Sequence, residues 1–385
     1  MKNILFIHQS ADLYGSDKML LYLVESVKNE AYPIIVVPEI GPLTEELRKR
    51  DIEFIINPVI KVSRELYASF KIFIIPFLIF SAMRSLRGKL GNRKIDIIHS
   101  NTLAVFLGAF YSKKFKIKHV WHIHEIIIQP KLAAKMYPFL VNLFSDYVVF
   151  NSKASCEYLC VGKPELKKKA KVIYNGLDRD LPFSSKDEQK SLRKKFFNSE
   201  NESSLILGLF GRINKYKGHN LLLNVFEQLF TDNKNIKLLY IGSTTKSQAN
   251  LLDELRKEIT KRKLDDYITI IPFQKELWKF YDSVDIIIVP TISLESFGLV
   301  AIEGMLSKKP VIGSNHGGLK EIILHNKTGI LFEPNNEVAL KSSIKKLIDN
   351  KNLITLFGEE GEKRAILEFS LENYVNKFKV LYRSI

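Results

Sequence analysis

The sequence predicts an α/β protein made of two doubly wound domains. Short apolar runs recur along the chain, and most are rich in β-branched residues and nearly unbroken by polar ones. Such runs are typical of parallel strands buried on both faces. Several segments between them, such as 16–29, 250–263 and 337–348, have the length and periodicity of amphipathic helices. Strands that alternate with helices indicate βαβ units. A chain of 385 residues is long for one hydrophobic core, so we expect two domains.

The predicted strands form two series. The first series lies at residues 4–7, 33–37, 53–56, 95–99, 119–124, 146–150 and 171–174, and the second at 205–210, 236–242, 268–273, 285–290, 310–314 and 329–332.

Between the two series, over residues 178–204, the sequence is polar, charged and poor in strand-forming residues. We place the join of the domains near Leu177–Asp180 and expect a helix at 187–197 to open the second domain. The expected organisation is a first domain over 1–178, a second domain over 179–365, and a C-terminal helix over 366–385 that caps the second domain or crosses back to the first.

The composition indicates a folded and strongly basic protein. The 58 lysines and arginines exceed the 42 acidic residues by 16, which suits a nucleic acid, an anionic membrane, an anionic substrate or simply a solvated lysine-rich surface. The two cysteines, Cys156 and Cys160, lack a second pair or a nearby histidine cluster. This favours free thiols and a reducing compartment over a metal site. The N-terminal apolar run is too short for a signal peptide, so we expect a cytoplasmic protein.

The stretch Leu66–Met83 is apolar, with one charge at Lys71. It is consistent with a membrane-spanning helix, a buried crossover helix or an interfacial helix. A basic run over 84–94 follows it, and further basic clusters occupy 113–118 and 163–171. Such clusters favour anionic lipid headgroups. We therefore expect peripheral contact with an anionic membrane surface, at the inner face of the cell membrane.

Ligands of doubly wound sheets bind beyond the carboxyl ends of the strands. The segment GRINKYKGH follows one predicted strand and contains Gly211, Arg212 and Lys217. Glycine permits close approach of a ligand, the guanidinium can bind two phosphate oxygens, and the ammonium supplies a point charge. The alternative interpretation is a solvated basic loop. The chain contains neither the P-loop pattern nor G-x-G-x-x-G.

The segment SLESFGLVAIEGM follows another predicted strand. Ser296 is expected to cap a helix, so that the backbone amides of Phe297–Leu299 point from an N-terminus that attracts anions. Glu295 beside this anion site suits the hydroxyl groups of a sugar. Glu303 lies in an apolar helix face and needs a partner, which is either the ribose of a nucleotide or a nearby lysine or arginine.

Two further loops are candidates for contact with the same ligand. Gly317–Gly318 follows a predicted strand as a tight loop that allows close ligand approach. In the N-terminal half, Tyr14, Gly15 and Ser16 stand where the first long helix begins, and this is a second helix N-terminus that can face a ligand.

The series GRINKYKG, SLESFGLVAIEGM, NHGGLKEII and NKTGILF, preceded by VIYNGLD, resembles the retaining glycosyltransferases of family 4. The resemblance covers nearly the whole chain and is strongest from Val172 to Phe332. It implies the GT-B fold, with two Rossmann-like domains facing a cleft. It further implies a metal-independent enzyme without a cofactor, whose C-terminal domain binds a nucleotide-sugar and whose N-terminal domain binds the acceptor.

The resemblance also implies roles for residues. Arg212 and Lys217 would neutralise the donor diphosphate, Glu295 would hold the donor sugar and Glu303 the ribose. His124, in HVWHIHE, matches the family's cleft histidine, whereas a histidine satisfied within its strand is the alternative for His99 and His122. The predicted catalytic residues are Arg212, Lys217, Glu295 and His124; the donor-binding residues are Gly15, Gly211, Glu295, Phe297, Gly298, Leu299 and Glu303; and the acceptor-binding residues are His124, His99 and Asn101.

The first loop departs from the family pattern. The family often has a Gly-Gly pair followed by Ala or Ser and then Glu, where this chain has Tyr14-Gly15-Ser16-Asp17. The contacts of this loop with the donor are therefore the part of the site that the resemblance describes least well.

The expected function is sugar transfer from a nucleoside-diphosphate sugar to a hydroxyl of a glycan acceptor in bacterial surface polysaccharide biosynthesis, with a lipid-linked acceptor and a UDP-sugar favoured slightly over a GDP-sugar. Three alternatives remain. A non-hydrolysing nucleotide-sugar epimerase has the same fold. A metal-dependent transferase is suggested by the D-x-D at 178–180, although these acids fall in the domain join. A nucleic-acid-binding protein would fit the charge, but aromatic residues are not interleaved with the basic runs.

Overall fold

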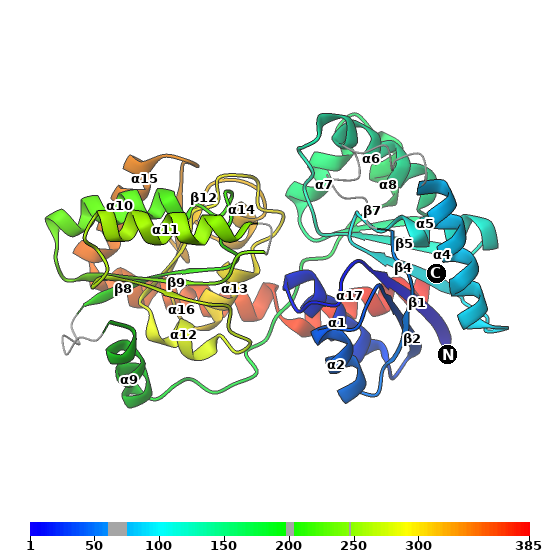
Figure 1. Cartoon of the computed structure of the whole chain (residues 1–385), viewed down its shortest axis with the longest axis horizontal. Coiled ribbons are helices and arrows are strands. Elements are labelled where there is room, and N and C mark those ends of the chain that lie inside the picture. Colours follow the sequence, from blue (N-terminus) through cyan, green and yellow to red (C-terminus); the bar gives the residue numbers. More distant parts are fainter. Residues whose placement is uncertain (61–74, 198–203, 246–247) are drawn as a thin grey trace. The chain divides into compact units, whose positions relative to one another are not determined.

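The computed structural model describes residues 1–60, 75–197, 204–245 and 248–385. The chain divides into two compact units: the first unit contains Met1–Gly176 and Leu371–Ile385, and the second contains Leu177–Ser370. Within each unit, helices cover both faces of a central sheet (Figure 1). The prediction of two doubly wound α/β domains is confirmed.

The first unit is built on a parallel sheet, which in the described residues has the strand order β3-β2-β1-β4-β5-β6-β7. Its strands are β1 (Lys2–His8), β2 (Ala31–Val37), β3 (Glu53–Ile56), β4 (Ile97–Asn101), β5 (Lys118–Ile123), β6 (Tyr147–Phe150) and β7 (Ala170–Val172). Its helices are α1 (Gly15–Val27), α2 (Pro42–Lys49), α4 (Ile75–Leu90), α5 (Phe106–Phe115), α6 (Lys131–Phe144), α7 (Lys153–Cys160), α8 (Pro164–Lys169) and α17 (Leu371–Ser384).

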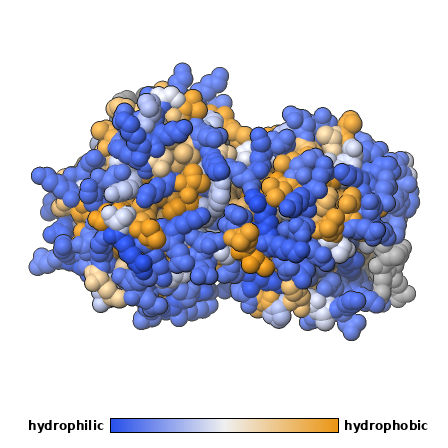
Figure 2. All heavy atoms as spheres, turned by 180° about the vertical axis from the view of Figure 1, so that it is seen from behind, coloured by the Kyte–Doolittle hydropathy of each residue, from blue (hydrophilic) through white to orange (hydrophobic). Residues whose placement is uncertain are grey.

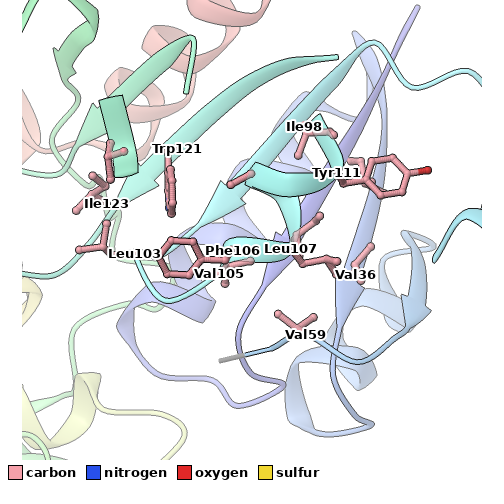
Figure 3. Packing of buried hydrophobic residues seen from close by; sticks show 14 of the residues in the cluster. Val36, Val59, Ile98, Leu103, Val105, Phe106, Leu107, Tyr111, Trp121 and Ile123 are labelled. Carbon is pink, nitrogen blue, oxygen red and sulfur yellow. The ribbon is translucent and has the colours of Figure 1, made fainter. Parts of the chain in front are cut away.

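Two layers of helices cover this sheet. Side chains of α4, α5 and α6 share one core with those of β1, β2, β4 and β5, and Figure 1 shows α1, α2 and α17 on the opposite face. Figure 3 shows the first of these cores, in which Trp121 of β5 meets Phe106 of α5 edge-on, with ring centroids 5.4 Å apart. Phe106 also stacks on Tyr137 of α6 at 5.8 Å. Large rings at the strand–helix contact fix the position of each helix, because a close-packed core tolerates few other arrangements.

Helix α17 belongs to the first unit although it ends the chain. Its buried residues Tyr374, Phe378, Leu381 and Tyr382 follow the spacing of one helix face. The Tyr374 hydroxyl donates a hydrogen bond to the Met19 carbonyl of α1 over 3.4 Å. This helix therefore closes the core on the α1 side of the sheet.

The second unit is also built on a parallel sheet, whose order in the described residues is β10-β9-β8-β11-β12-β13. Its strands are β8 (Leu205–Phe210), β9 (Ile236–Ile241), β10 (Ile268–Ile271), β11 (Ile286–Val289), β12 (Val311–Ser314) and β13 (Gly329–Phe332). Its helices are α9 (Lys186–Phe197), α10 (His219–Asp232), α11 (Ala249–Lys261), α12 (Trp278–Ser283), α13 (Leu299–Leu306), α14 (Leu319–Ile322), α15 (Glu337–Asp349) and α16 (Lys351–Glu368).

The C-terminal segment is less continuous than its amphipathic pattern indicates. We expect a single helix over 366–385 from the sequence, but α16 ends at Glu368 and α17 begins at Leu371. The two helices have different packing partners, since α16 lies against α13 in the second unit. A Cβ atom on Gly358 of α16 would lie 2.1 Å from the Lys308 carbonyl oxygen just after α13, so the backbones approach closely.

The apolar stretch Leu66–Met83 is described only from Ile75, where α4 begins; residues 66–74 lie outside the described residues. In α4, Ile79 and Met83 are buried, whereas Phe77 is exposed. Among the described residues, the structure contains no helix with both the length and the apolar character that crossing a membrane requires.

Candidate active site

Each sheet has one position where the chain turns from one edge toward the other. In the second unit, β8 lies between β9 and β11, so the loops after β8 and β11 leave from neighbouring strands. Such a switch point is where doubly wound sheets bind ligands. The two loops, residues 211–218 and 290–298, contain most of the predicted donor site.

The loop after β8 can take its path only with glycine at both ends. Gly211 and Gly218 have φ angles of 131° and 75°, a region that other residues rarely adopt. A Cβ atom on Gly218 would also lie 1.9 Å from the Pro290 carbonyl oxygen. The loop is further attached to the end of β11 by a hydrogen bond of 2.8 Å from the Ile292 amide to the Tyr216 carbonyl.

This path brings Lys217 directly to Glu295. The Lys217 ammonium donates a hydrogen bond to the Glu295 carboxylate over 2.5 Å, and the two side chains are 28% and 18% exposed. Sequence reasoning assigned these residues to different parts of the donor and did not include their contact. The half-buried Arg212 lies in the same loop as Lys217. An ammonium and a carboxylate therefore meet in one partly exposed place at the ends of β8 and β11, and Arg212 lies in the loop that supplies the ammonium.

The loop after β12 holds the backbone of Glu295 in place. The Gly318 amide donates a hydrogen bond to the Glu295 carbonyl over 2.8 Å. Gly317 has a φ of 56°, and a Cβ atom there would lie 2.1 Å from the same oxygen. His316 Nε2 donates to the Thr291 carbonyl over 2.9 Å. The Gly317–Gly318 pair thus lets two loops pack backbone against backbone, which positions Glu295.

Helix α13 begins two residues later than predicted, and Ser296 does not cap it. The N-cap is Gly298, which has a φ of 117° and no side-chain cap. By the geometry of helix ends, the amides that lack helical partners begin at Gly298 and continue through Leu299. Phe297, the first of the predicted anion-binding positions, has its side chain buried with a ring centroid 6.0 Å from that of Phe369. The predicted positive helix end exists, but it is shifted along the chain.

Glu303 of α13 finds its partner in a tyrosine. The Tyr281 hydroxyl of α12 donates a hydrogen bond to Glu303 over 2.6 Å. Burial and the neighbouring carboxylate raise the pKa of Tyr281 well above its ordinary value, so the hydroxyl stays protonated and can donate. The Tyr281 ring stacks on Phe210 at the end of β8, with centroids 3.9 Å apart. The sequence contained no signal for this contact, because Tyr281 and Glu303 are in different helices.

In the first unit the switch point lies between β1 and β4. His8 ends β1, Asn101 ends β4, and His124 follows β5. His124 Nε2 lies 3.0 Å from the Asn101 side-chain oxygen, and the Asn101 amide nitrogen lies 3.0 Å from His8 Nδ1. His8 Nε2 completes the chain with a contact of 2.5 Å to the Asp17 carboxylate.

Burial and hydrogen bonding set the charges of Asp17 and His124 in this network. Burial opposes ionisation of Asp17, but hydrogen bonds from His8, Ser10 and the Tyr14 amide outweigh it and hold the pKa of the carboxyl below its ordinary value. Burial, with a contribution from His8, lowers the pKa of His124 to about 3. His124 is therefore neutral at physiological pH. Its Nε2–H donates to Asn101, which leaves Nδ1 as a hydrogen-bond acceptor.

Two members of this network, His8 and Asp17, were missed by sequence reasoning. The signal was present at Asp17, which stands at the position of the family's loop glutamate in the Tyr14–Asp17 segment. Gly15 is the first residue of α1, whose N-cap is Tyr14. The departure from the family pattern in this loop is therefore accompanied by a carboxylate that binds the end of β1.

His99 does not belong to the site, and its predicted role in acceptor binding is corrected. It is completely buried, its Nδ1 lies 2.7 Å from the Tyr382 hydroxyl of α17, and its ring packs near Phe378. His122 is buried beside it, with ring centroids 5.4 Å apart. Burial holds the pKa values of both imidazoles well below the ordinary value, so they are neutral core residues.

The D-x-D at 178–180 has structural partners. Arg179, between the two acids, binds Asp282 through two hydrogen bonds of 3.0 and 2.7 Å, and Asp180 accepts a hydrogen bond from the Trp278 indole. In the part of the chain that the structure describes, no group of three or more His, Cys, Asp or Glu residues is arranged to hold a metal ion.

Comparison with known proteins identifies the family. Residues 17–181 match the model of Glycosyltransferase Family 4, and residues 190–364 match that of Glycosyl transferases group 1. An uncharacterized glycosyltransferase of Methanocaldococcus jannaschii is 28% identical over 92% of this chain and 97% of its own. The lipopolysaccharide 1,2-N-acetylglucosaminetransferase of Salmonella typhimurium is 29% identical over 50% of this chain and 51% of its own.

The fold comparison agrees over the full length. The crystal structure of Anabaena HepE in complex with UDP-glucose superposes with a TM-score of 0.85 at 21% identity and covers all of both chains. The two family matches together span most of the chain, the fold is that of GT-B glycosyltransferases, and this protein belongs to the group 1, family 4 glycosyltransferases.

Proposed function

We propose that the protein transfers a sugar, with retention of anomeric configuration, from a nucleoside-diphosphate sugar to a glycan hydroxyl. The observation that carries the proposal is the convergence of Lys217, Glu295 and the N-terminus of α13 at the switch point of the second unit. A diphosphate needs cations and free amides, and a sugar needs a hydrogen-bond acceptor. These groups are held there by loops that only glycine allows.

The donor would replace contacts that the chain now makes within itself. Phosphate oxygens would bind the Lys217 ammonium, the Arg212 guanidinium and the amides at Gly298–Leu299. The Glu295 carboxylate would then accept hydrogen bonds from sugar hydroxyls in place of Lys217. Glu303 would bind the ribose, while Tyr281 continues to donate to one of its oxygens.

The proposed reaction breaks the bond between the anomeric carbon and the donor phosphate, and the electron pair leaves with the diphosphate. The acceptor oxygen forms its new bond on the same face, and its proton passes to the leaving phosphate. Negative charge grows on that phosphate in an oxocarbenium-like transition state. Lys217, Arg212 and the N-terminus of α13 would stabilise it. No protein base and no metal ion is needed in this scheme.

We assign acceptor binding to the first unit. Neutral His124 can accept a hydrogen bond from the acceptor hydroxyl through Nδ1. Asn101 holds the His124 ring through a hydrogen bond, and His8 in turn holds the Asn101 amide. We propose a lipid-linked glycan acceptor in bacterial surface polysaccharide assembly, at the cytoplasmic face of the membrane. The similarity to a lipopolysaccharide glycosyltransferase of Salmonella supports this assignment.

A uridine nucleotide is the proposed donor base, supported by the UDP-glucose bound to Anabaena HepE. The test is a thermal-shift screen of UDP, GDP, dTDP and ADP without added metal. A ligand at 100 times its Kd stabilises the native state by about 2.7 kcal/mol. At equal concentrations the nucleotide with the lowest Kd gives the largest shift, so UDP should raise the unfolding temperature most. Glu303→Gln should weaken this shift, because the amide retains the shape of the carboxylate but loses its charge for the ribose hydroxyls.

The matched control is Glu337→Gln, since Glu337 also accepts hydrogen bonds at the surface of the second unit but lies at the start of α15. It should leave the UDP shift unchanged. If no nucleoside diphosphate shifts the unfolding temperature of the unmodified protein, the proposed donor site is wrong.

A further inference from the structure

Helix α6 of the first unit presents an apolar stripe to solvent. Leu132, Met136, Phe139 and Leu143 are spaced by four, three and four residues, which places them on one helix face. Their side chains are exposed by 65%, 45%, 60% and 49%. On the face of the molecule drawn in Figure 2, apolar side chains form separate patches among hydrophilic ones. Single exposed apolar residues need no explanation, but four aligned ones indicate an interaction surface.

The orientation of α6 is fixed by its other face. Ala133, Tyr137 and Val141 are buried in the core between α6 and the sheet, and Tyr137 stacks on Phe106 at 5.8 Å. The helix therefore has two apolar faces, of which the fold covers one. Rotating the stripe inward would expose the core face, so the stripe is a stable feature of the surface.

The charge around the stripe is mostly positive, since α7 and α8, which pack against α6, contain four basic and two acidic residues, a net charge of 4 − 2 = +2. Helices α4, α5 and α6, all within the described part of the chain, contain Arg84, Arg87, Lys89, Lys113, Lys114, Lys131 and Lys135 and no acidic residue, a net charge of 7 − 0 = +7. The helices on the opposite face of the same sheet, α1, α2 and α17, contain six basic and five acidic residues, a net charge of 6 − 5 = +1. The excess of positive charge is thus concentrated in the layer that carries the apolar stripe.

Apolar and basic groups are interleaved within this layer. In α6, Lys131 and Lys135 are exposed beside the stripe. At the junction of α4 and α5, the Lys114 ammonium lies 4.9 Å from the ring centroid of Phe80, which is 53% exposed. Long basic side chains can keep their charge at a headgroup while apolar neighbours enter the acyl region.

We propose that the outer face of α4, α5 and α6 docks onto a bilayer surface that contains anionic phospholipid, with the α6 stripe inserted at the headgroup–acyl boundary. A nucleic acid would use the positive charge but not the aliphatic stripe, and an apolar protein groove would not require the charge. This inference names the surface for the membrane contact proposed above, but its test does not depend on sugar transfer.

The test is co-sedimentation of the full-length protein with phosphatidylcholine vesicles, with and without phosphatidylglycerol, at low and high salt. Binding should require phosphatidylglycerol and weaken as salt screens the charges. The double variant Leu132→Gln/Phe139→Gln should lower the affinity for these vesicles by at least about tenfold, because two inserted apolar side chains are lost. Lys131→Glu/Lys135→Glu should also lower the affinity by at least about tenfold, since each cation near an anionic surface contributes on the order of 1 kcal/mol.

The matched control is Ile366→Gln/Leu367→Gln on α16, where two exposed apolar residues lie in the second unit. It should bind vesicles like the unmodified protein. A second readout uses Phe139→Trp and Ile366→Trp: brominated lipid should quench the added fluorescence of the first and not that of the second. Each variant should retain the UDP-induced thermal shift, which shows that it is folded and that its donor site is intact. A loss of vesicle binding can then be distinguished from a failure of the proposed donor site.

Two results would overturn the proposal. One is that the unmodified protein does not bind phosphatidylglycerol vesicles at low salt. The other is that the α6 double variant binds them as tightly as the α16 control, which would mean that another surface carries the contact.

Discussion

The Lys217–Glu295 pair shows how a single contact can hold two charged groups of a candidate binding site in place. An ammonium and a carboxylate 2.5 Å apart satisfy each other while both are partly buried, which avoids the free-energy cost of an unpaired charge. In the proposed function, a diphosphate sugar would replace the partners of both groups at once. The same residue-scale logic applies to Glu303, whose hydrogen bond from Tyr281 keeps one oxygen occupied and the side chain oriented.

Replacing Lys217 tests its role directly. We expect Lys217→Ala and Arg212→Ala each to lower kcat by roughly 10²-fold or more, the effect of losing one group that stabilises transition-state charge. The control is Lys215→Ala, because Lys215 is an exposed lysine of the same loop and its loss changes the net charge equally. Initial rates with a UDP-sugar measure the effect. Near-normal turnover in the first two variants, or an equal loss in all three, would contradict the assignment.

At the scale of elements, both candidate sites lie where the order of strands reverses. In each unit, the loops at the switch point start from neighbouring strands, so residues far apart in the sequence meet within one hydrogen-bonding distance. The contact between the loops that follow β11 and β12 is the tightest example, since Gly317 and Gly318 lie against the backbone of Glu295. Through this contact, two glycines that have no functional side chain fix the position of the Glu295 carboxylate.

Gly317→Ala should therefore lower the free energy of unfolding by more than the cost of a left-handed alanine alone. The left-handed conformation costs an alanine roughly 1–2 kcal/mol, and a Cβ atom 2.1 Å from the Glu295 carbonyl oxygen requires the two loops to separate as well. Gly162→Ala is the matched control, because Gly162 has a φ of 65° with no atom within 4 Å of an added Cβ. Both variants should lower the free energy of unfolding, measured in urea.

Only Gly317→Ala should also weaken the UDP-induced thermal shift, because only that loop positions Glu295. If Gly317→Ala and Gly162→Ala have the same stability and the same UDP shift, the loop contact does not support the site.

At the scale of the whole molecule, the histidines make stability depend on pH. Burial lowers the pKa of His119 to about 4 and those of His124 and His219 to about 3, against an ordinary value of 6.5. Below pH 6.5 the unfolded chain binds protons that the folded chain cannot accept. The stability is therefore complete above pH 6.5 and falls as the pH decreases toward the folded pKa values.

Each of these three imidazoles should cost on the order of 2 kcal/mol of unfolding free energy at pH 5 relative to pH 7. Urea midpoints at the two pH values measure the difference. His219→Gln should reduce it, whereas His325→Gln, at an exposed histidine, should not. Equal midpoints of the unmodified protein at pH 7 and pH 5 would show that the buried imidazoles do not remain neutral.

Much of the fold and part of the site could be predicted from the sequence, because the relevant signals are local. Unbroken apolar runs identify buried parallel strands, and glycines beside charged residues after such strands identify binding loops. Arg212, Lys217, Glu295 and Glu303 were assigned to the candidate donor site in this way. His99 was assigned wrongly, because a buried and an accessible histidine look alike in a strand, and its contact with Tyr382 joins residues 283 positions apart.

The amino-acid sequence by itself determined the family, the two doubly wound sheets and the residue types at the strand ends, since these depend on periodicity and on motifs a few residues long. Tertiary structure alone decided the partners: Lys217 with Glu295, Tyr281 with Glu303, and Asp17 with His8. It also decided that α17 closes the first unit and that one apolar face of α6 is left uncovered by the fold. The physical reason is that a side chain's charge state and accessibility depend on what packs against it, and packing brings together segments that no local pattern connects.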